Sequence, residues 1–159
     1  MTEVADAVTP RIEGVHHLKV PVSDLQTSLD FYERALGAQR IPEADHIRPD
    51  GSLFAYILRI DNLGTLLELR LNPDRARLHG GFDPMTLLVK DRTALRAWDE
   101  HLSQQGIAHS PVLTAMQAWL MVVPDPDNTR IRLYTAETHG PELPPDAASP
   151  WLDDSVRQT

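Results

Sequence analysis

The chain has 159 residues, of which 42% are hydrophobic and 24% are charged, a balance that excludes wholesale disorder and a coiled coil. It has no cysteine, which excludes a disulfide framework, a thiolate metal site and an iron–sulfur cluster. The net charge of −8 disfavours nucleic acid as a partner. No apolar stretch is long enough for a membrane span and the N-terminus lacks a signal-peptide layout, so the sequence predicts a cytoplasmic protein.

The first predicted elements are a strand and a helix. Residues 1–11 have no periodic pattern and are expected to form a loose leader. In residues 15–22 apolar and polar side chains alternate, which is typical of a half-buried strand. Asp24 suits an N-cap, apolar residues follow at helical spacing from Leu25 to Leu36, and Gly37 is placed to end the helix.

Three further strands complete the first half, and the same order of elements then returns. Residues 38–45, 52–61 and 65–72 have strand character, with a turn at 61–64 that predicts a hairpin. A connection rich in proline, glycine and aspartate follows at 72–83. The second half has a strand at 85–91, a helix with Leu95, Trp98 and Leu102 on one stripe, and strands at 107–114, 118–125 and 129–136. A turn is expected at 125–128.

The two halves are an internal repeat. Asp24 corresponds to Asp91 at an offset of 67 (91 − 24 = 67), and apolar strand residues match at the same offset. We therefore predict one domain over residues 12–137, built from two βαβββ modules at about 12–72 and 82–137. The proline-rich tail, 138–159, is expected to be extended, the alternative being that Trp151 and Leu152 dock on the domain.

Four segments resemble the vicinal oxygen chelate superfamily, which includes glyoxalase I, bleomycin-resistance proteins, fosfomycin-resistance enzymes and extradiol dioxygenases. They are HHLKVPVSDLQTSLDFYERALG, TLLELRL, GFDPMTLLVKD and PDPDNTRIRLY, within residues 12 to 136. The resemblance implies an α+β fold in which two βαβββ modules form an incomplete barrel around a cavity, the glyoxalase/bleomycin-resistance/dioxygenase fold. It also implies a homodimer, since family members pair modules within or across chains.

The resemblance also implies where a metal would bind. The first-module ligand positions are His17 and Glu68, but the second-module positions carry Pro84 and Arg132. A prolyl nitrogen has no lone pair to donate, and a guanidinium stays protonated and repels a divalent cation. Two protein ligands are fewer than the three of typical catalytic sites, unless His46 or His79 contributes. We therefore expect no cofactor, the alternative being Ni, Mn, Fe or Zn on His17 and Glu68.

Alternation within the strands predicts a polar sheet face opposite the apolar face that the helices cover. Its predicted members are the following side chains: His17, Lys19, Glu68, Arg70, Arg132 and Tyr134, with Thr86, Leu88 and Lys90 beside them. Such a face is often only the solvent-exposed side of an antiparallel sheet, with no binding role. The curl implied by the resemblance would make it concave, and concave sites with convergent polar groups bind small molecules.

Roles can be assigned to residues on and beside this face. We predict Glu68, His17 and Tyr134 as catalytic residues, and a salt bridge from Arg132 to Glu68 in place of a metal. The predicted ligand-binding residues are Arg132, Arg70, Lys19, Tyr56, Trp119 and Met121. For Trp119 and Met121, core packing is an equal alternative to a cavity wall.

Three functions remain open. The first is a metal-free protein that binds a small organic molecule, which should be anionic or oxygen-rich because basic residues outnumber Glu68 on the polar face. The second is an enzyme, either a metal-dependent lyase, isomerase or dioxygenase, or a metal-free acid–base catalyst. The third is a module that only mediates assembly. We favour the first.

Overall fold

The computed structural model describes residues 8–153, and its first half forms one βαβββ module. The elements of module one are β1 (His17–Val22), α1 (Leu25–Leu36), β2 (Gln39–Arg40), the short 3-10 helix η1 (Pro42–Ala44), β3 (His46–Ile47), β4 (Leu53–Arg59) and β5 (Leu66–Leu71). The strand order is β1-β5-β4-β2, with β3 also paired to β4. β1 runs parallel to β5, whereas β4 and β5 form the predicted antiparallel hairpin.

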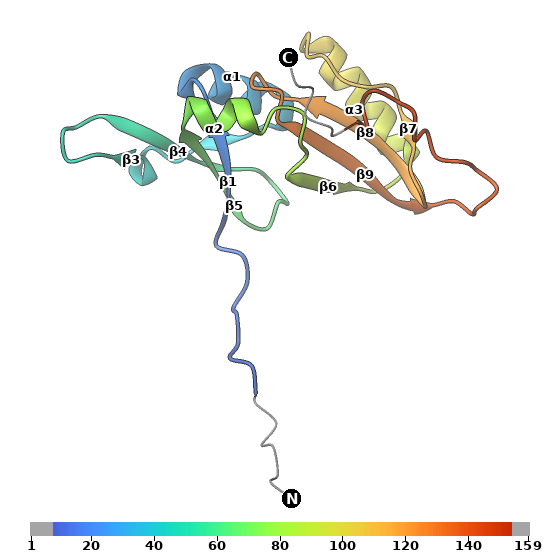
Figure 1. Ribbon diagram of the computed structural model, residues 1–159, viewed down its shortest axis with the longest axis horizontal. Coiled ribbons are helices and arrows are strands. Elements are labelled where there is room, and N and C mark those ends of the chain that lie inside the picture. Colours follow the sequence, from blue (N-terminus) through green and yellow to red (C-terminus); the bar gives the residue numbers. More distant parts are fainter. Residues whose placement is uncertain (1–7, 154–159) are drawn as a thin grey trace, which may run out of the picture.

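The second half repeats this plan. A short helix, α2 (Pro73–Leu78), leads into module two, whose elements are β6 (Met85–Val89), α3 (Arg92–Gln104), β7 (Leu113–Thr114), β8 (Ala118–Pro124) and β9 (Arg130–Thr138). The strand order is β6-β9-β8-β7, and β6 runs parallel to β9 as β1 does to β5. The two sheets lie side by side (Figure 1), so the predicted α+β architecture of paired βαβββ modules is confirmed.

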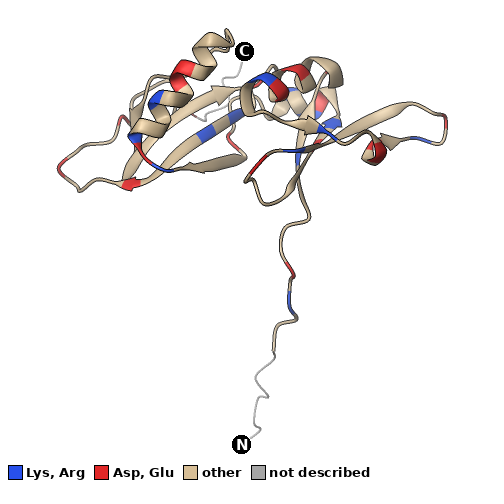
Figure 2. Cartoon of the chain, turned by 180° about the vertical axis from the view of Figure 1, so that it is seen from behind, with Lys and Arg blue, Asp and Glu red and all other residues tan. Residues whose placement is uncertain are grey.

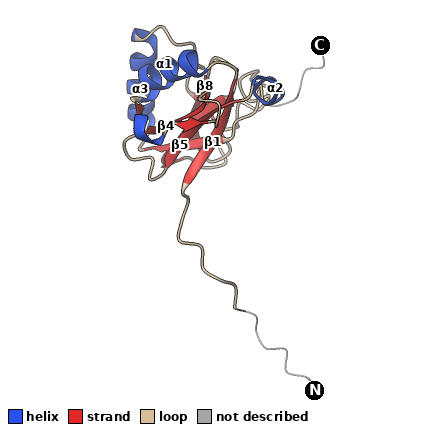
Figure 3. Cartoon of the chain, turned by 90° about the vertical axis from the view of Figure 1, so that its left-hand side faces the viewer, coloured by secondary structure: helices blue, strands red, loops and turns tan. Residues whose placement is uncertain are grey.

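α1 and α3 cover the same side of the sheets (Figure 3). Asp24 caps α1 by accepting a hydrogen bond from the Thr27 amide at 2.7 Å, which lowers the pKa of Asp24, and Asp91 caps α3 through the Ala94 amide at 2.9 Å. Gly37 ends α1 with φ of 65°, a conformation that costs glycine little. Buried side chains from both modules form one core under these helices, so the modules fold as one unit.

Several predicted boundaries were wrong. The strands expected at 38–45 and 107–114 shrink to two residues each, because Pro42 and Pro111 have no amide proton for a ladder. The first strand begins at His17 rather than at residue 15. The connection at 72–83 contains α2, which Asn72 caps by accepting from the Arg75 amide at 3.1 Å.

The tail is docked in the part that the structure describes, so the extended conformation expected for it was wrong there. Trp151 and Leu152 pack on a second apolar cluster formed by Leu113, Ala115, Leu120 and Val122, which also contacts Tyr134. The predicted leader and tail extend into residues 1–7 and 154–159, which lie outside the described residues. Within residues 8–153 no helix has the length and apolarity needed to cross a membrane.

Candidate functional site

Glu68 is the centre of the polar face of module one. It lies in the middle of β5, with Lys19 of β1 as its neighbour on one side and Ile57 of β4 on the other. Its side chain is completely buried, although a carboxylate is rarely buried without compensation. The strand alternation explains the position, because even-numbered residues of β5 face away from α1.

Basic and imidazole side chains surround the Glu68 carboxylate. Arg70 donates to Oε1 through Nε at 2.6 Å, and its Nη2 lies 2.5 Å from the same oxygen, so the guanidinium holds Oε1 firmly. The distances to the remaining groups are 3.6 Å from His46 Nδ1 to Oε1, 3.1 Å from His17 Nε2 to Oε2, and 3.7 Å from Lys19 Nζ to Oε2. The predicted polar-face residues His17, Lys19 and Arg70 therefore do come together around Glu68.

The second carboxylate oxygen, Oε2, retains acceptor capacity. It makes no hydrogen bond to any described residue, because the 3.1 Å contact with His17 is not aligned as one. His17 Nδ1 lies 2.9 Å from Nδ1 of His16, so a neutral His17 that accepts there carries its proton on Nε2, facing the carboxylate. Oε2 is therefore a buried acceptor whose hydrogen-bonding capacity no described residue fills.

An aromatic ring helps to hold Arg70. The guanidinium carbon of Arg70 lies 4.8 Å from the centre of the Phe54 ring, and Arg48 lies at the same distance from that ring. No sequence pattern points to Phe54, because its role depends on β4 lying beside β5. Arg70 thus has both a carboxylate and a ring to fix its position.

The predicted pairing of Arg132 with Glu68 was wrong. Arg132 Nε lies 2.6 Å from Oδ2 of Asp83, a residue just before β6, which is the parallel neighbour of β9. Both side chains are largely buried, at 25% and 16% exposure, so this pair is local to module two. Tyr134 is also separate from Glu68, because it packs in the second apolar cluster beside Trp151.

Three predicted ligand-binding residues, Tyr56, Trp119 and Met121, lie in the core, which for Trp119 and Met121 was the stated alternative. Met121 is fully buried and pairs with Leu133 on the face that the helices cover, and Tyr56 pairs with Leu69 on the same face of the other sheet. The Trp119 ring packs against the Arg92 guanidinium, 4.1 Å away, and against His139. These three side chains are held by packing.

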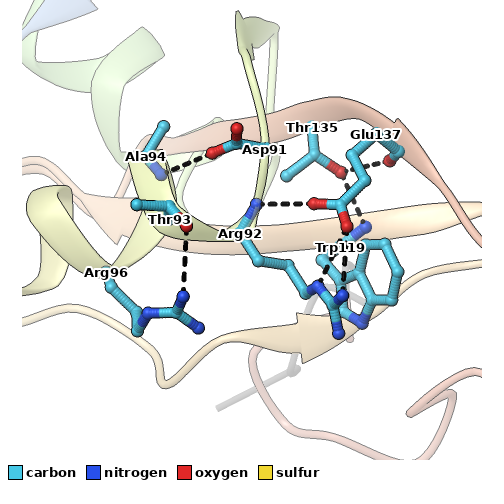
Figure 4. Close-up of polar contacts among 8 residues, drawn as sticks. All are labelled: Asp91, Arg92, Thr93, Ala94, Arg96, Trp119, Thr135 and Glu137. Carbon is cyan, nitrogen blue, oxygen red and sulfur yellow. Dashed lines mark hydrogen bonds and ion pairs between the residues drawn. The ribbon is translucent and has the colours of Figure 1, made fainter.

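Figure 4 shows how Trp119 is fixed. Arg92, at the start of α3, donates to the Glu137 carboxylate through its backbone amide at 2.9 Å and through its guanidinium at 3.0 Å and 3.2 Å. The amide contact is the main cause of the lowered pKa of Glu137. The Trp119 amide donates to Thr135 Oγ1 at 3.1 Å, so both the ring and the backbone of Trp119 have partners within module two.

The donors around Glu68 do not fit a divalent metal. In residues 8–153 no three histidine or carboxylate side chains are arranged to hold an ion. Oε1 of Glu68 already receives the Arg70 guanidinium, and the Lys19 ammonium lies 3.7 Å from Oε2. Positive groups at these distances oppose a cation. His79 lines a hollow beside α2, and in the described part of the chain no hydrogen bond or ion pair joins it to the Glu68 carboxylate.

Known proteins share both the sequence pattern and the fold of this chain. A family model described as Glyoxalase/Bleomycin resistance protein/Dioxygenase superfamily matches residues 14–133. The chain belongs to this superfamily, whose members include lyase, drug-resistance and dioxygenase types.

Particular relatives extend the comparison. The chain is 27% identical over 134 residues to "Putative ring-cleaving dioxygenase MhqA" of Bacillus subtilis (strain 168), covering 82% of this chain and 42% of that protein. It thus spans less than half of that relative's length. Its fold is similar to TnmS3, an antibiotic binding protein from Streptomyces sp. CB03234, with a TM-score of 0.64 and 22% identity, over 81% and 100% of the two chains. It is also similar to a glyoxylase/bleomycin resistance protein/dioxygenase domain from Frankia sp. EAN1pec, with a TM-score of 0.62 and 22% identity, over 80% of this chain and 94% of that chain.

Proposed function

We propose that the protein binds a small, anionic or oxygen-rich organic molecule on the polar face of module one, without a tightly bound metal. The observation that carries this proposal is the fully buried Glu68 carboxylate, whose charge is balanced by Arg70 and Lys19. Because the side chains of Arg70 and Lys19 supply the compensating positive charge, no metal ion is needed to stabilise the buried carboxylate.

The contacts of Glu68 also define what a ligand would meet. Oε2 is buried but has a free acceptor lone pair, so a ligand hydroxyl or amine reaches it only by displacing a neighbouring side chain, and the neighbouring cations favour oxygen atoms that carry negative charge. His17 is 34% exposed at its side chain, so a ligand can reach it. This combination suits a ligand that has both an oxyanion and a hydrogen-bond donor.

Acid–base catalysis is the second candidate, and the unbonded Oε2 favours it. In this version Glu68 takes a proton from a carbon beside a carbonyl, and Arg70 stabilises the enolate oxygen that develops. The abstracted proton resides on Oε2, and His17 can relay it to solvent. Tyr134 and Arg132 have no part, because they are engaged within module two.

A thermal-shift screen tests the proposal. Small carboxylates and phosphonates should raise the melting temperature, and cationic drugs should not, because a ligand that prefers the native state stabilises it. Glu68→Gln keeps the side-chain shape and should abolish the shift, whereas Glu137→Gln, which alters a carboxylate far along β9, should leave it intact. Stabilisation by cations alone, or equal shifts in Glu68→Gln and the parent protein, would contradict the proposal.

A further inference from the structure

The short helix α2 forms one wall of a basic hollow beside the polar face of module one. α2 packs against β1 on the side of the sheet opposite α1 and α3 (Figure 3). The hollow, which we name the α2 pocket, has a volume of about 440 Å³ and is lined by Lys19, Pro21, Arg70, Asn72, Arg75 and His79. Figure 2 shows basic segments both on the strands of module one and on the helix beside them.

The lining of the α2 pocket has a single sign of charge. Lysine, arginine and histidine supply four of its six residues, and none is a carboxylate, although the whole chain carries a net charge of −8. Lys19 and Arg70 also approach Glu68, so that one buried carboxylate is shared between two cations. A cleft lined by one sign of charge concentrates ligands of the opposite sign.

Arg75 carries the excess positive charge of the pocket, and His79 adds a ring nitrogen that can donate a hydrogen bond. In residues 8–153 no carboxylate forms an ion pair with either side chain, because the acidic residue of α2, Asp74, pairs with Arg77 at 3.1 Å. The two residues are four apart, which places them on one face of the helical turn. A guanidinium can donate two parallel hydrogen bonds to one oxyanion.

We infer that the α2 pocket binds the oxyanion group of the ligand, a carboxylate, phosphonate or phosphate, with Arg75 and His79 on one side and Lys19 on the other. The inference rests on the proposed function and deepens it: Arg70 both lines the pocket and contacts Glu68, so the rest of the ligand extends from the pocket over Arg70 toward the side chains around Glu68. Arg75 and His79 are then specificity residues contributed by an element outside the repeated βαβββ plan.

Calorimetric titration with inorganic phosphate and with acetate tests the inference at constant ionic strength. Saturable binding is expected, and Arg75→Ala should weaken it by about tenfold or more. Arg77→Ala is the matched control, because it removes the same charge from the same helix at a side chain that pairs with Asp74 and lines a different hollow. It should weaken binding by less than about twofold, as expected for a long-range charge effect.

The outcomes separate this inference from the proposed function. No saturable binding of either anion, or equal weakening by Arg75→Ala and Arg77→Ala, would overturn the inference. An organic ligand that depends on Glu68 but not on Arg75 would also overturn it while leaving the proposed function standing. Anion binding that needs Arg75, together with organic ligands that ignore Glu68→Gln, would support the pocket and contradict the proposed function.

Discussion

Among the described residues, 8–153, a single buried hydrogen bond between side chains connects the two modules. Tyr32, in α1, donates its hydroxyl proton to Asp125 Oδ2 at 3.0 Å, and the other oxygen of Asp125 accepts from the amides of Asp127 and Thr129 at 2.9 Å each. Burial raises the pKa of Asp125 to about 6 despite these donors, and burial together with Asp125 raises the pKa of Tyr32. Asp125 therefore titrates in the folded protein at a higher pH than in the unfolded chain.

This shift predicts a pH dependence of stability. Because the folded pKa, about 6, lies above the ordinary value of 3.8, the contribution of Asp125 is fully present below 3.8 and is lost as the pH rises through 6. Asp125→Asn removes the titration. The difference in unfolding free energy, parent minus variant, should fall by about 3 kcal/mol between about pH 3 and pH 8, measured by urea denaturation. A difference that does not change with pH would contradict the assignment.

At the same scale, alternation in the sequence predicted which residues surround Glu68 but not every partner. His17, Lys19 and Arg70 could be placed because they lie on the same face of β1 and β5. The partner of Arg132 could not be predicted, because alternation shows which face a side chain is on but not the register between strands. Asp83 lies beside Arg132 only because β6 pairs with β9. Alternation did place Trp119 and Met121 on one face of β8, and the structure has both in the core, which was the alternative to a cavity wall.

At the scale of elements, the tail and α2 depart from the repeated plan. The tail pairs with β7 through Thr114 and Asp146, whose carboxylate accepts from the Thr114 amide at 2.7 Å. Arg130 then donates to the backbone carbonyls of Trp151 and Asp153, at 3.0 Å and 2.7 Å. The repeat could not predict either segment because neither has a counterpart, although the Asn72-Pro73 pair is a helix-start signal.

The docked tail should contribute to stability. Trp151→Ala removes half-buried apolar surface from the second cluster and should lower the unfolding free energy by about 1–2 kcal/mol. Met116→Ala is the control, because that side chain is 75% exposed and its removal should cost little. Equal effects of the two substitutions in thermal or urea unfolding would show that the tail does not pack on the domain.

At the scale of the whole molecule, the shared core makes the two modules one cooperative unit. Beyond the buried apolar side chains, His101 of α3 contacts the carbonyls of Arg34 and Ala35 in α1, at 3.0 Å and 3.1 Å, and Arg34 donates to the Gln105 carbonyl at 2.9 Å. These contacts join the C-terminal ends of both helices. Separation of the modules would expose the core that they share.

Unfolding should therefore be a single transition. All three tryptophans, Trp98, Trp119 and Trp151, lie in module two or in the tail, so tryptophan fluorescence is weighted toward that half of the chain, whereas far-ultraviolet circular dichroism reports the secondary structure of both modules. The two signals should give the same urea midpoint, as two-state unfolding requires. Different midpoints would mean that the modules unfold independently.

The most direct test of the central claim, a ligand site built on Glu68 without a metal, is calorimetric titration of metal-stripped protein with Ni²⁺, Mn²⁺, Fe²⁺ and Zn²⁺. His17→Ala and Glu68→Ala are titrated in parallel. Because the Arg70 guanidinium and the Lys19 ammonium lie against the carboxylate, we predict no micromolar binding of any of these ions. Micromolar or tighter binding that is lost in both variants would contradict the claim and make His17 and Glu68 a working metal centre.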